Sequence, residues 1–343
     1  MFYCTPNACY PRHVANPEQL LGSTLAAWTA RPEAGSSPDE ASLYRQFHRH
    51  GSHPDVPADG RQITTVELEG ETRKFLLQHT DGVETESVIM PIEGRSGRIR
   101  HTLCLSSQVG CAMGCTFCQT ATMGRVRQLT TSEIVAQWHW AKHALNANIT
   151  NIVFMGMGEP MDNLDAVLAA IEILVDHNAA AIPASRVGVS TVGHADGIRR
   201  FTRFMQQDGM HQLRLAVSVN AQNEETRQSL MPIARAVPLS ALHDAMQGWI
   251  DAGGQPILIE YVLIPGVNDT PTAAEELATW LGKLPCRVNV IPYNPKVDSP
   301  WPAPEECQVS QFVQSVAATG LSVNRRRTTG RTVMAACGQL GAK

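Results

Sequence analysis

The stretch TLCLSSQVGCAMGCTFC, residues 102–118, places Cys111, Cys115 and Cys118 close together in the chain. It overlaps the run RIRHTLCLS, residues 98–106, whose apolar and β-branched residues predict a β-strand. The three cysteines therefore lie in a loop directly after a predicted strand. Cysteines clustered in a chain of this size, without a secretion signal, indicate metal binding or catalysis rather than a disulfide framework.

Downstream of this strand, short apolar runs alternate with helical patterns. Several of the runs are almost wholly apolar, which is typical of parallel strands covered on both faces. Repeated β-α units imply parallel strands joined by right-handed crossovers, and fewer units than a closed barrel needs indicate a partial barrel. The expected strands are residues 98–106, 151–157, 186–191, 213–220, 256–264 and 287–293, and the expected helices are residues 130–145, 164–177, 195–207, 238–252 and 272–284.

The N-terminal part has a different composition. Residues 1–60 are rich in Pro, His, Gly and Ser and contain one predicted helix, residues 17–28. QITTVELEG (62–70) and RKFLLQHTDG (73–82) predict a hairpin that leads into ESVIMPI (86–92). We therefore divide the chain into an N-terminal accessory segment (1–60), a hairpin and linker (61–96) and a core domain with a C-terminal catalytic segment (97–343).

The composition is that of an ordinary globular protein. Of the 343 residues, 43% are hydrophobic and 17% are charged, and the net charge of −4 does not indicate a polycation that coats nucleic acid. No apolar run approaches the roughly 20 residues that span a membrane. The N-terminus lacks the basic and apolar regions of a secretion signal. We expect a cytoplasmic protein with no membrane association.

The cysteine spacing favours an iron–sulfur cluster over zinc. Structural zinc requires four ligands, usually as two pairs. No second pair is present, because Cys286, Cys307 and Cys337 are each isolated in the sequence. Three thiolates suit a 4Fe–4S cluster in which one iron atom has no protein ligand and can bind a small molecule.

Cys-x3-Cys-x2-Cys after the first strand of a six-unit β-α barrel resembles the radical S-adenosylmethionine superfamily. Four further motifs, TLCLSSQVGC, VFMGMGEPMDN, IPYNP and AACGQLG, resemble the RlmN/Cfr family of RNA methyltransferases, from about Lys74 to Gly341. The resemblance implies an α/β fold with a partial (β/α)6 TIM-like barrel. It also implies two cofactors, a 4Fe–4S cluster held by Cys111, Cys115 and Cys118 with one open iron, and S-adenosyl-L-methionine.

The resemblance assigns three catalytic residues. Cys337 in AACGQL matches the cysteine that becomes S-methylated, and Cys104 in TLCLSS matches the cysteine that forms a transient disulfide with it. Glu86 in ESVIMP matches the glutamate that handles the proton lost from the base. Glu84, two residues earlier on the same face of the strand, remains an alternative to Glu86.

The resemblance also assigns the cofactor pocket. The matching positions lie at or just beyond the ends of predicted strands, where α/β barrels place their sites. Asn220 stands where the family usually has histidine, and asparagine can still donate and accept hydrogen bonds. The expected S-adenosylmethionine contacts are Gly158, Glu159, Ser190, Ser218, Val219, Asn220 and Asn294.

The activity implied by the resemblance is radical methylation of an adenosine carbon, C2 in the first instance, in 23S ribosomal RNA and also transfer RNA. The target base would have to be unstacked, and Arg325–Arg327 and Arg331 could hold phosphates beside Cys337. The expected partners are the RNA and an electron donor such as flavodoxin or ferredoxin, and the expected state is a monomer.

Other interpretations remain open at this point. They are methylation of C8, a different RNA target, and a non-catalytic Fe–S or zinc protein that binds RNA. Radical modification of a peptide would usually require auxiliary clusters, for which Cys4 and Cys9 are the available ligands. The sequence of the N-terminus also lacks the helical accessory pattern expected of this family.

Overall fold

The computed structural model describes residues 2–5, 8–11, 15–31, 38–93, 97 and 99–341. Its main feature is one ten-stranded sheet with the order β14-β13-β12-β11-β10-β9-β6-β5-β4-β3. The pairs from β6 to β14 are parallel, whereas β3, β4, β5 and β6 pair antiparallel. This order, which begins at β14 and ends at β3, agrees with the predicted partial barrel.

The parallel strands carry the apolar runs found in the sequence. Each of the expected strands is present, and β14 adds a short parallel strand that the sequence did not predict. The strands are β6 (Ile99–Cys104), β9 (Ile149–Phe154), β10 (Val187–Thr191), β11 (Arg214–Ser218), β12 (Ile257–Leu263), β13 (Cys286–Pro292) and β14 (Val323–Arg325).

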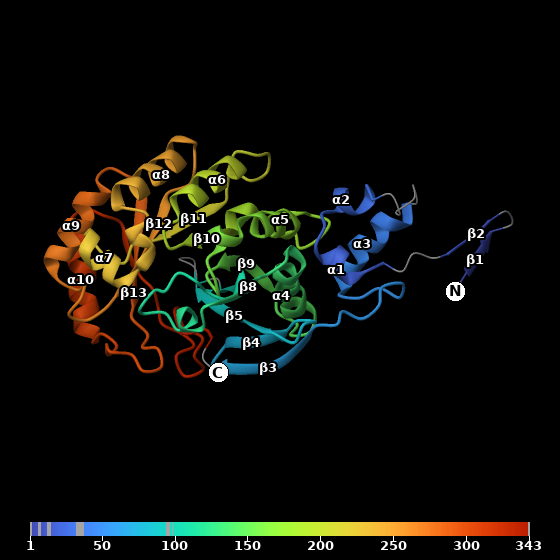
Figure 1. Ribbon diagram of the computed structural model, residues 1–343, viewed down its shortest axis with the longest axis horizontal. Helices are drawn as coiled ribbons and strands as arrows, with labels where there is room; N and C mark the ends of the chain where they lie inside the picture. Colours follow the sequence, from blue (N-terminus) through green and yellow to red (C-terminus); the bar gives the residue numbers. More distant parts are fainter. Residues whose placement is uncertain are drawn as a thin grey trace.

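Helices cover the outer face of this sheet (Figure 1). The five expected helices are confirmed as α4 (Thr131–His143), α5 (Leu164–Val175), α6 (Ala195–Met205), α8 (Leu239–Asp251) and α9 (Pro271–Leu281). The capping box that opens α4 is formed, since Thr130 and Glu133 each accept the other's backbone N–H. Two helices were not predicted, α7 (Glu224–Leu230) and α10 (Glu306–Ala318).

The predicted hairpin is also present, and it belongs to the main sheet. β3 (Gln62–Glu69) pairs with β4 (Thr72–Gln78), and β4 pairs with β5 (Glu84–Glu93), which joins β6. The segment expected to link two units thus hydrogen-bonds into the core sheet. The division of the chain at residues 60 and 96 stays a prediction, and residues 94–96 lie outside the described part.

The N-terminal segment contains more helix than the sequence indicated. In place of one helix over residues 17–28 there are two, α1 (Pro17–Leu21) and α2 (Leu25–Thr29), because Thr24 caps a new helix with its side chain. A third helix, α3 (Pro38–His50), has a polar sequence and was missed. α1 packs on α4, and Figure 1 shows all three beside α4 and α5. A separate two-stranded sheet is formed by β1 (Phe2–Thr5) and β2 (Ala8–Pro11).

No helix in the described ranges combines the length and apolar character needed to cross a bilayer.

Candidate functional site

The three clustered cysteines lie in the loop of a small hairpin. β7 (Gln108–Gly110) pairs antiparallel with β8 (Arg125–Gln128), so that the residues between them form one closed loop. The loop is tied at its base by a 2.9 Å hydrogen bond from Cys111 N to Gly124 O. Gly110 is required there, since its φ is 73° and a Cβ would lie 1.8 Å from Gly124 O.

The electrostatics of this loop suit a positively charged group. Burial, with smaller contributions from the Cys118 and Glu159 charges, raises the pKa of Cys111 to about 12. Burial, then Cys118 and Cys111, raise the pKa of Cys115. The negative charges of neighbouring thiolates repel one another. A bound metal removes this penalty, because its positive charge stabilises the deprotonated thiols that coordinate it. The loop therefore fits a cluster held by Cys111, Cys115 and Cys118.

The arrangement does not resemble a site for one ion. Among the described residues, no group of three His, Cys, Asp or Glu side chains is placed to hold a single metal ion. In a 4Fe–4S cluster each cysteine binds a different iron, so the sulfur atoms stand farther apart than around one ion.

Gly158 and Glu159 follow β9 next to this loop. Gly158 has a φ of 99°, and a Cβ there would lie 2.6 Å from Gln108 Cβ. The buried Glu159 accepts hydrogen bonds from Met161 N (3.0 Å) and Val192 N (2.9 Å), while burial raises its pKa to about 7. Glu159 thus joins the loops that follow β9 and β10, and its role toward a cofactor stays a prediction.

The remaining residues expected at the cofactor lie at the same ends of the strands. Ser190 is in β10, Ser218 ends β11 with Val219 directly after it, and Asn294 follows β13. Neighbouring strands place Ser190 opposite Ala216, and Ser218 opposite Glu260.

Asn220, the position that departs from the family, has a structural role in this chain. Its φ of 57° lies in the left-handed region, which asparagine tolerates better than most residues. Its Oδ1 accepts a hydrogen bond from Val262 N (2.8 Å), and its Nδ2 lies 3.2 Å from Met231 Sδ. The amide therefore closes the loop after β11.

The C-terminal segment, residues 330–341, crosses from β14 to the cysteine loop and on to β5. Gln119 N donates to Gly338 O (2.7 Å), and Thr120 Oγ1 donates to Leu340 O (2.6 Å). Gly341 N donates to Glu86 Oε1 (3.0 Å). The segment thereby connects the cysteine loop to Glu86.

Cys337 and Cys104 are brought into one neighbourhood by this crossing. Burial, with a smaller contribution from the charge of Cys337, raises the pKa of Cys104 to about 12. Burial also raises the pKa of Cys337, while the Arg326 guanidinium lowers it and the Cys118 charge opposes ionisation. Cys337 therefore lies close enough to both Cys104 and Cys118 for their charges to affect one another.

Of the two candidate bases, Glu86 faces the C-terminal segment. It is buried, and its Oε2 lies 3.8 Å from Nζ of the buried Lys74. Glu84 is partly exposed and accepts a hydrogen bond from Thr64 Oγ1 on β3 (2.6 Å). The structure therefore places Glu86, rather than Glu84, beside the C-terminal segment.

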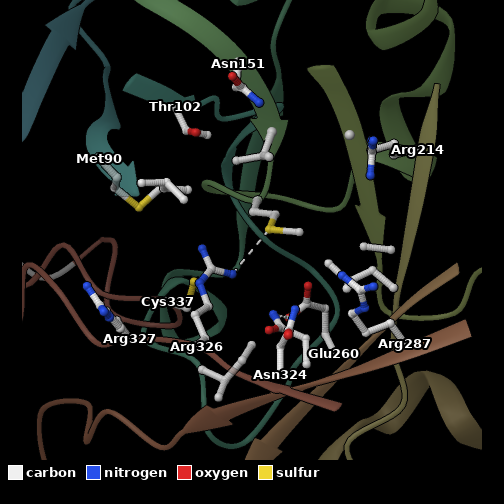
Figure 2. Close-up of a pocket in the computed structure, with 18 of the residues that line it drawn as sticks. Met90, Thr102, Asn151, Arg214, Glu260, Arg287, Asn324, Arg326, Arg327 and Cys337 are labelled. Carbon is white, nitrogen blue, oxygen red and sulfur yellow. Dashed lines mark hydrogen bonds between the residues drawn. The ribbon is translucent and has the colours of Figure 1, made fainter. Parts of the chain in front are cut away.

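The arginines before Cys337 are adjacent in the sequence and were expected to act together, but the structure separates them. Arg325 pairs with Glu306 on α10, and Arg327 is exposed and lies 3.5 Å from Glu93. Arg326 turns inward, where its Nη1 lies 3.6 Å from Met155 Sδ (Figure 2). The charge of Cys337, followed by those of Glu260 and Cys104, raises its pKa. A strand prediction for β14 would have separated the three, since alternate residues face opposite sides.

Comparison with known proteins gives consistent results. Residues 105–277 match the model of the Radical SAM superfamily. A protein of Protochlamydia amoebophila named "Probable dual-specificity RNA methyltransferase RlmN 1" is 41% identical over 273 residues, covering 80% of this chain and 74% of the relative. A "Probable RNA methyltransferase" of Sorangium cellulosum is 42% identical over 338 residues, covering 96% of this chain and 79% of the relative. The crystal structure of a radical SAM methyltransferase from Sphaerobacter thermophilus has a TM-score of 0.86 at 35% identity, covering 94% of this chain and 99% of that one.

Proposed function

Because this chain belongs to the radical SAM superfamily and, within it, to the RlmN family of RNA methyltransferases, we propose that it methylates C2 of an adenosine in 23S ribosomal RNA, with transfer RNA as a second substrate. The observation that carries the proposal is the path of the segment around Cys337: Ala335 and Leu340 share a buried cluster with Cys104, and Gly338 O accepts a hydrogen bond from Gln119 N of the cysteine loop (2.7 Å). A protein that only binds RNA has no need of such a path.

The cofactors are assigned to this chain's residues as follows. Cys111, Cys115 and Cys118 would hold a 4Fe–4S cluster, and S-adenosylmethionine would bind beside it. When bound, these groups supply a methyl group and a carbon-centred radical, which is chemistry that the protein itself lacks. The residues that position the S-adenosylmethionine are Gly158, Glu159, Ser190, Ser218, Val219, Asn220 and Asn294.

The chain's own residues then act in sequence. Cys337 loses its thiol proton and accepts the methyl group on sulfur, which holds the carbon beside the inserted base. Cys104, as a thiolate, attacks the sulfur of Cys337, so that a disulfide forms as the bond from sulfur to the transferred carbon breaks; the electron pair of that bond passes to the carbon and base, and the carbon takes up a proton to become the methyl group. Arg326 favours the thiolate form of both cysteines through its positive charge.

Glu86 is the proposed acceptor of the proton that leaves the base. Gly341 N and Lys74 approach its two oxygens from different sides, which fixes the direction of the carboxylate. External electrons are needed to start each turnover and to reduce the disulfide. We assign their supply to a small reductant protein such as flavodoxin or ferredoxin, acting on a monomeric, cytoplasmic enzyme.

The decisive experiment replaces the methyl-accepting cysteine. Cys337→Ala, purified and reconstituted anaerobically, is expected to keep its iron content and to lose methylation of RNA entirely. Cys307→Ala, which changes an exposed cysteine, is the matched control and should retain activity. Turnover by Cys337→Ala would refute the two-cysteine mechanism, and mass analysis of the modified nucleoside distinguishes C2 from C8.

A further inference from the structure

A cavity of about 1180 Å³ lies inside the curve of the sheet and adjoins Cys337 (Figure 2). Ligand pockets commonly measure about 300–1,000 Å³, so this one can hold a nucleoside. Of the residues proposed to contact S-adenosylmethionine, all of which the structure describes, Asn294 alone lines the cavity. The cavity therefore borders the cofactor position without coinciding with it.

One wall of the cavity is polar. Glu260 on β12 stands opposite Asn289 on β13, and Asn289 stands opposite Asn324 on β14, so these residues form a row across three strands. All three line the cavity, as does Arg326, two residues beyond Asn324. Barrel interiors are usually filled with branched apolar side chains, so a row of this kind indicates a function.

Glu260 is the unusual member of this row. It is only 3% exposed, and its Oε2 accepts a 2.8 Å hydrogen bond from Asn289 Nδ2. Its Oε1 is buried and has no hydrogen-bond partner. Leaving a buried carboxylate oxygen unpaired costs free energy, and such groups call for a ligand that supplies the missing donor.

Burial raises the pKa of Glu260, and the charge of Arg326 and the hydrogen bond from Asn289 offset part of this effect. Acidic side chains recognise N–H groups such as the exocyclic amines of bases. Met90 and Met155 line the same cavity and supply apolar surface, which suits the faces of an aromatic ring.

These observations, together with the proposed function, identify the occupant by its chemistry. We infer that the Glu260 carboxylate reads the exocyclic amino group of an unstacked adenine inserted into this cavity, with Asn289 and Asn324 completing the polar wall. Guanine is disfavoured, because it presents a carbonyl oxygen where adenine presents the amine. Adenine selection is thus assigned to the row on β12 to β14 and the methyl transfer to Cys337.

Nucleotide binding tests this inference without requiring turnover. Isothermal titration calorimetry on anaerobically reconstituted protein, with excess S-adenosylmethionine and no reductant, compares adenosine 5′-monophosphate with purine riboside 5′-monophosphate, which lacks the amine. The wild type should bind the purine nucleotide roughly 10- to 100-fold more weakly, the range expected for one hydrogen bond to a charged group. In Glu260→Ala the ratio of the two dissociation constants, purine nucleotide over adenosine nucleotide, should fall to near one.

Two further variants make the result decisive. Glu260→Gln keeps the side-chain shape and should reduce the ratio of the two dissociation constants. It replaces Glu260→Ala in the test if that variant does not fold. Glu93→Ala removes an exposed carboxylate that also lines the cavity, and it should keep the wild-type ratio. Equal binding of the two nucleotides by the wild type, or no binding of either, overturns the inference.

The proposed function is checked in the same preparation by a different readout. Mass spectrometry of the protein incubated without RNA reports S-methylation of Cys337. A wild type that methylates Cys337 but binds both nucleotides equally refutes the role of Glu260 alone. A wild type that discriminates the nucleotides but leaves Cys337 unmodified refutes the two-cysteine mechanism alone.

Discussion

Lys74 illustrates how one side chain supports the site. Its ammonium group is buried, 2.6 Å from Glu67 Oε2 and 3.8 Å from Glu86 Oε2. Lysine is rarely buried unless paired, and a buried carboxylate beside it gains in the same way. The ion pair therefore stabilises both β4, which carries Lys74, and the position of Glu86.

Lys74→Met is expected to lower the free energy of unfolding by about 3–5 kcal/mol, since it removes one partner of a buried ion pair. Denaturant titration followed by circular dichroism measures this. Arg73→Met is the control, because the adjacent Arg73 is exposed and donates to Leu145 O. Equal losses in the two variants would show that the Lys74 contacts contribute nothing specific.

The positions of site residues were predictable where a motif marked them. The spacing of the cysteine triplet predicted one shared loop, and its role as a ligand set stays a prediction. The inward position of Arg326 was not predicted, because β14 was not expected. Glu260 lies within the predicted strand 256–264, but the sequence does not reveal that Asn289 stands opposite it on β13.

At the scale of elements, three histidines join α3 to its neighbours: His139 and His143 on α4 contact the end of α3, and His48 on α3 contacts Leu20 on α1. His48 Nε2 lies 3.1 Å from Leu20 O, His139 Nε2 lies 3.1 Å from Gly51 O, and His143 Nε2 lies 3.1 Å from His48 O. Burial lowers the pKa of His48 to about 4 and that of His139 to about 3. Both rings are therefore neutral in the folded protein at neutral pH.

This contact is expected to weaken in acid. Each histidine has a folded pKa below its unfolded value of 6.5, so the unfolded chain binds more protons between the two values. Stability is full above about pH 6.5 and falls by roughly 1.4 kcal/mol per pH unit per histidine as the pH drops toward 4. His48→Gln should show a shallower slope than the wild type in unfolding measured from pH 7 to pH 5. His177→Gln, at an exposed position, should match the wild type, and identical slopes in all three proteins would contradict this account.

The β-α elements could be predicted because their strands are nearly continuous apolar runs and their helices have apolar faces. Three helices were not predicted. α3 has a largely polar sequence, α7 is only seven residues long, and α10 buries only Val309, Phe312 and Val316. β14 is three residues long, which is too short for an alternating pattern to be recognised in the sequence.

At the scale of the whole molecule, the C-terminal segment holds distant parts of the chain together. Besides Glu86 and the cysteine loop, it contacts β3 through Glu69, whose oxygens accept hydrogen bonds from Gly330 N (2.7 Å) and Thr332 N (2.6 Å). Hydrogen bonds from Thr332 lower the pKa of Glu69. Contacts between residues this far apart in sequence leave no local pattern, so only the family resemblance indicated that Cys337 returns to the barrel.

Glu69→Ala is expected to loosen this segment without unfolding the sheet. Hydrogen exchange should become faster at the amides of Gly330 and Thr332, and S-methylation of Cys337 should slow. Glu71→Ala, in the exposed turn after β3, is the matched control and should leave both unchanged. Unaltered exchange in Glu69→Ala would show that the segment is held by its other contacts alone.

The hydrogen bonds from Gln119 and Thr120 to the C-terminal segment begin directly after Cys118, the last cysteine of the loop. A change in the shape of that loop is therefore expected to move the segment that carries Cys337, the proposed methyl acceptor. If the loop holds the proposed iron–sulfur cluster, protein made in a cell short of iron would hold the C-terminal segment less firmly. Under the proposed function, methylation of Cys337 and of RNA would then decline together, and less S-adenosylmethionine would be consumed.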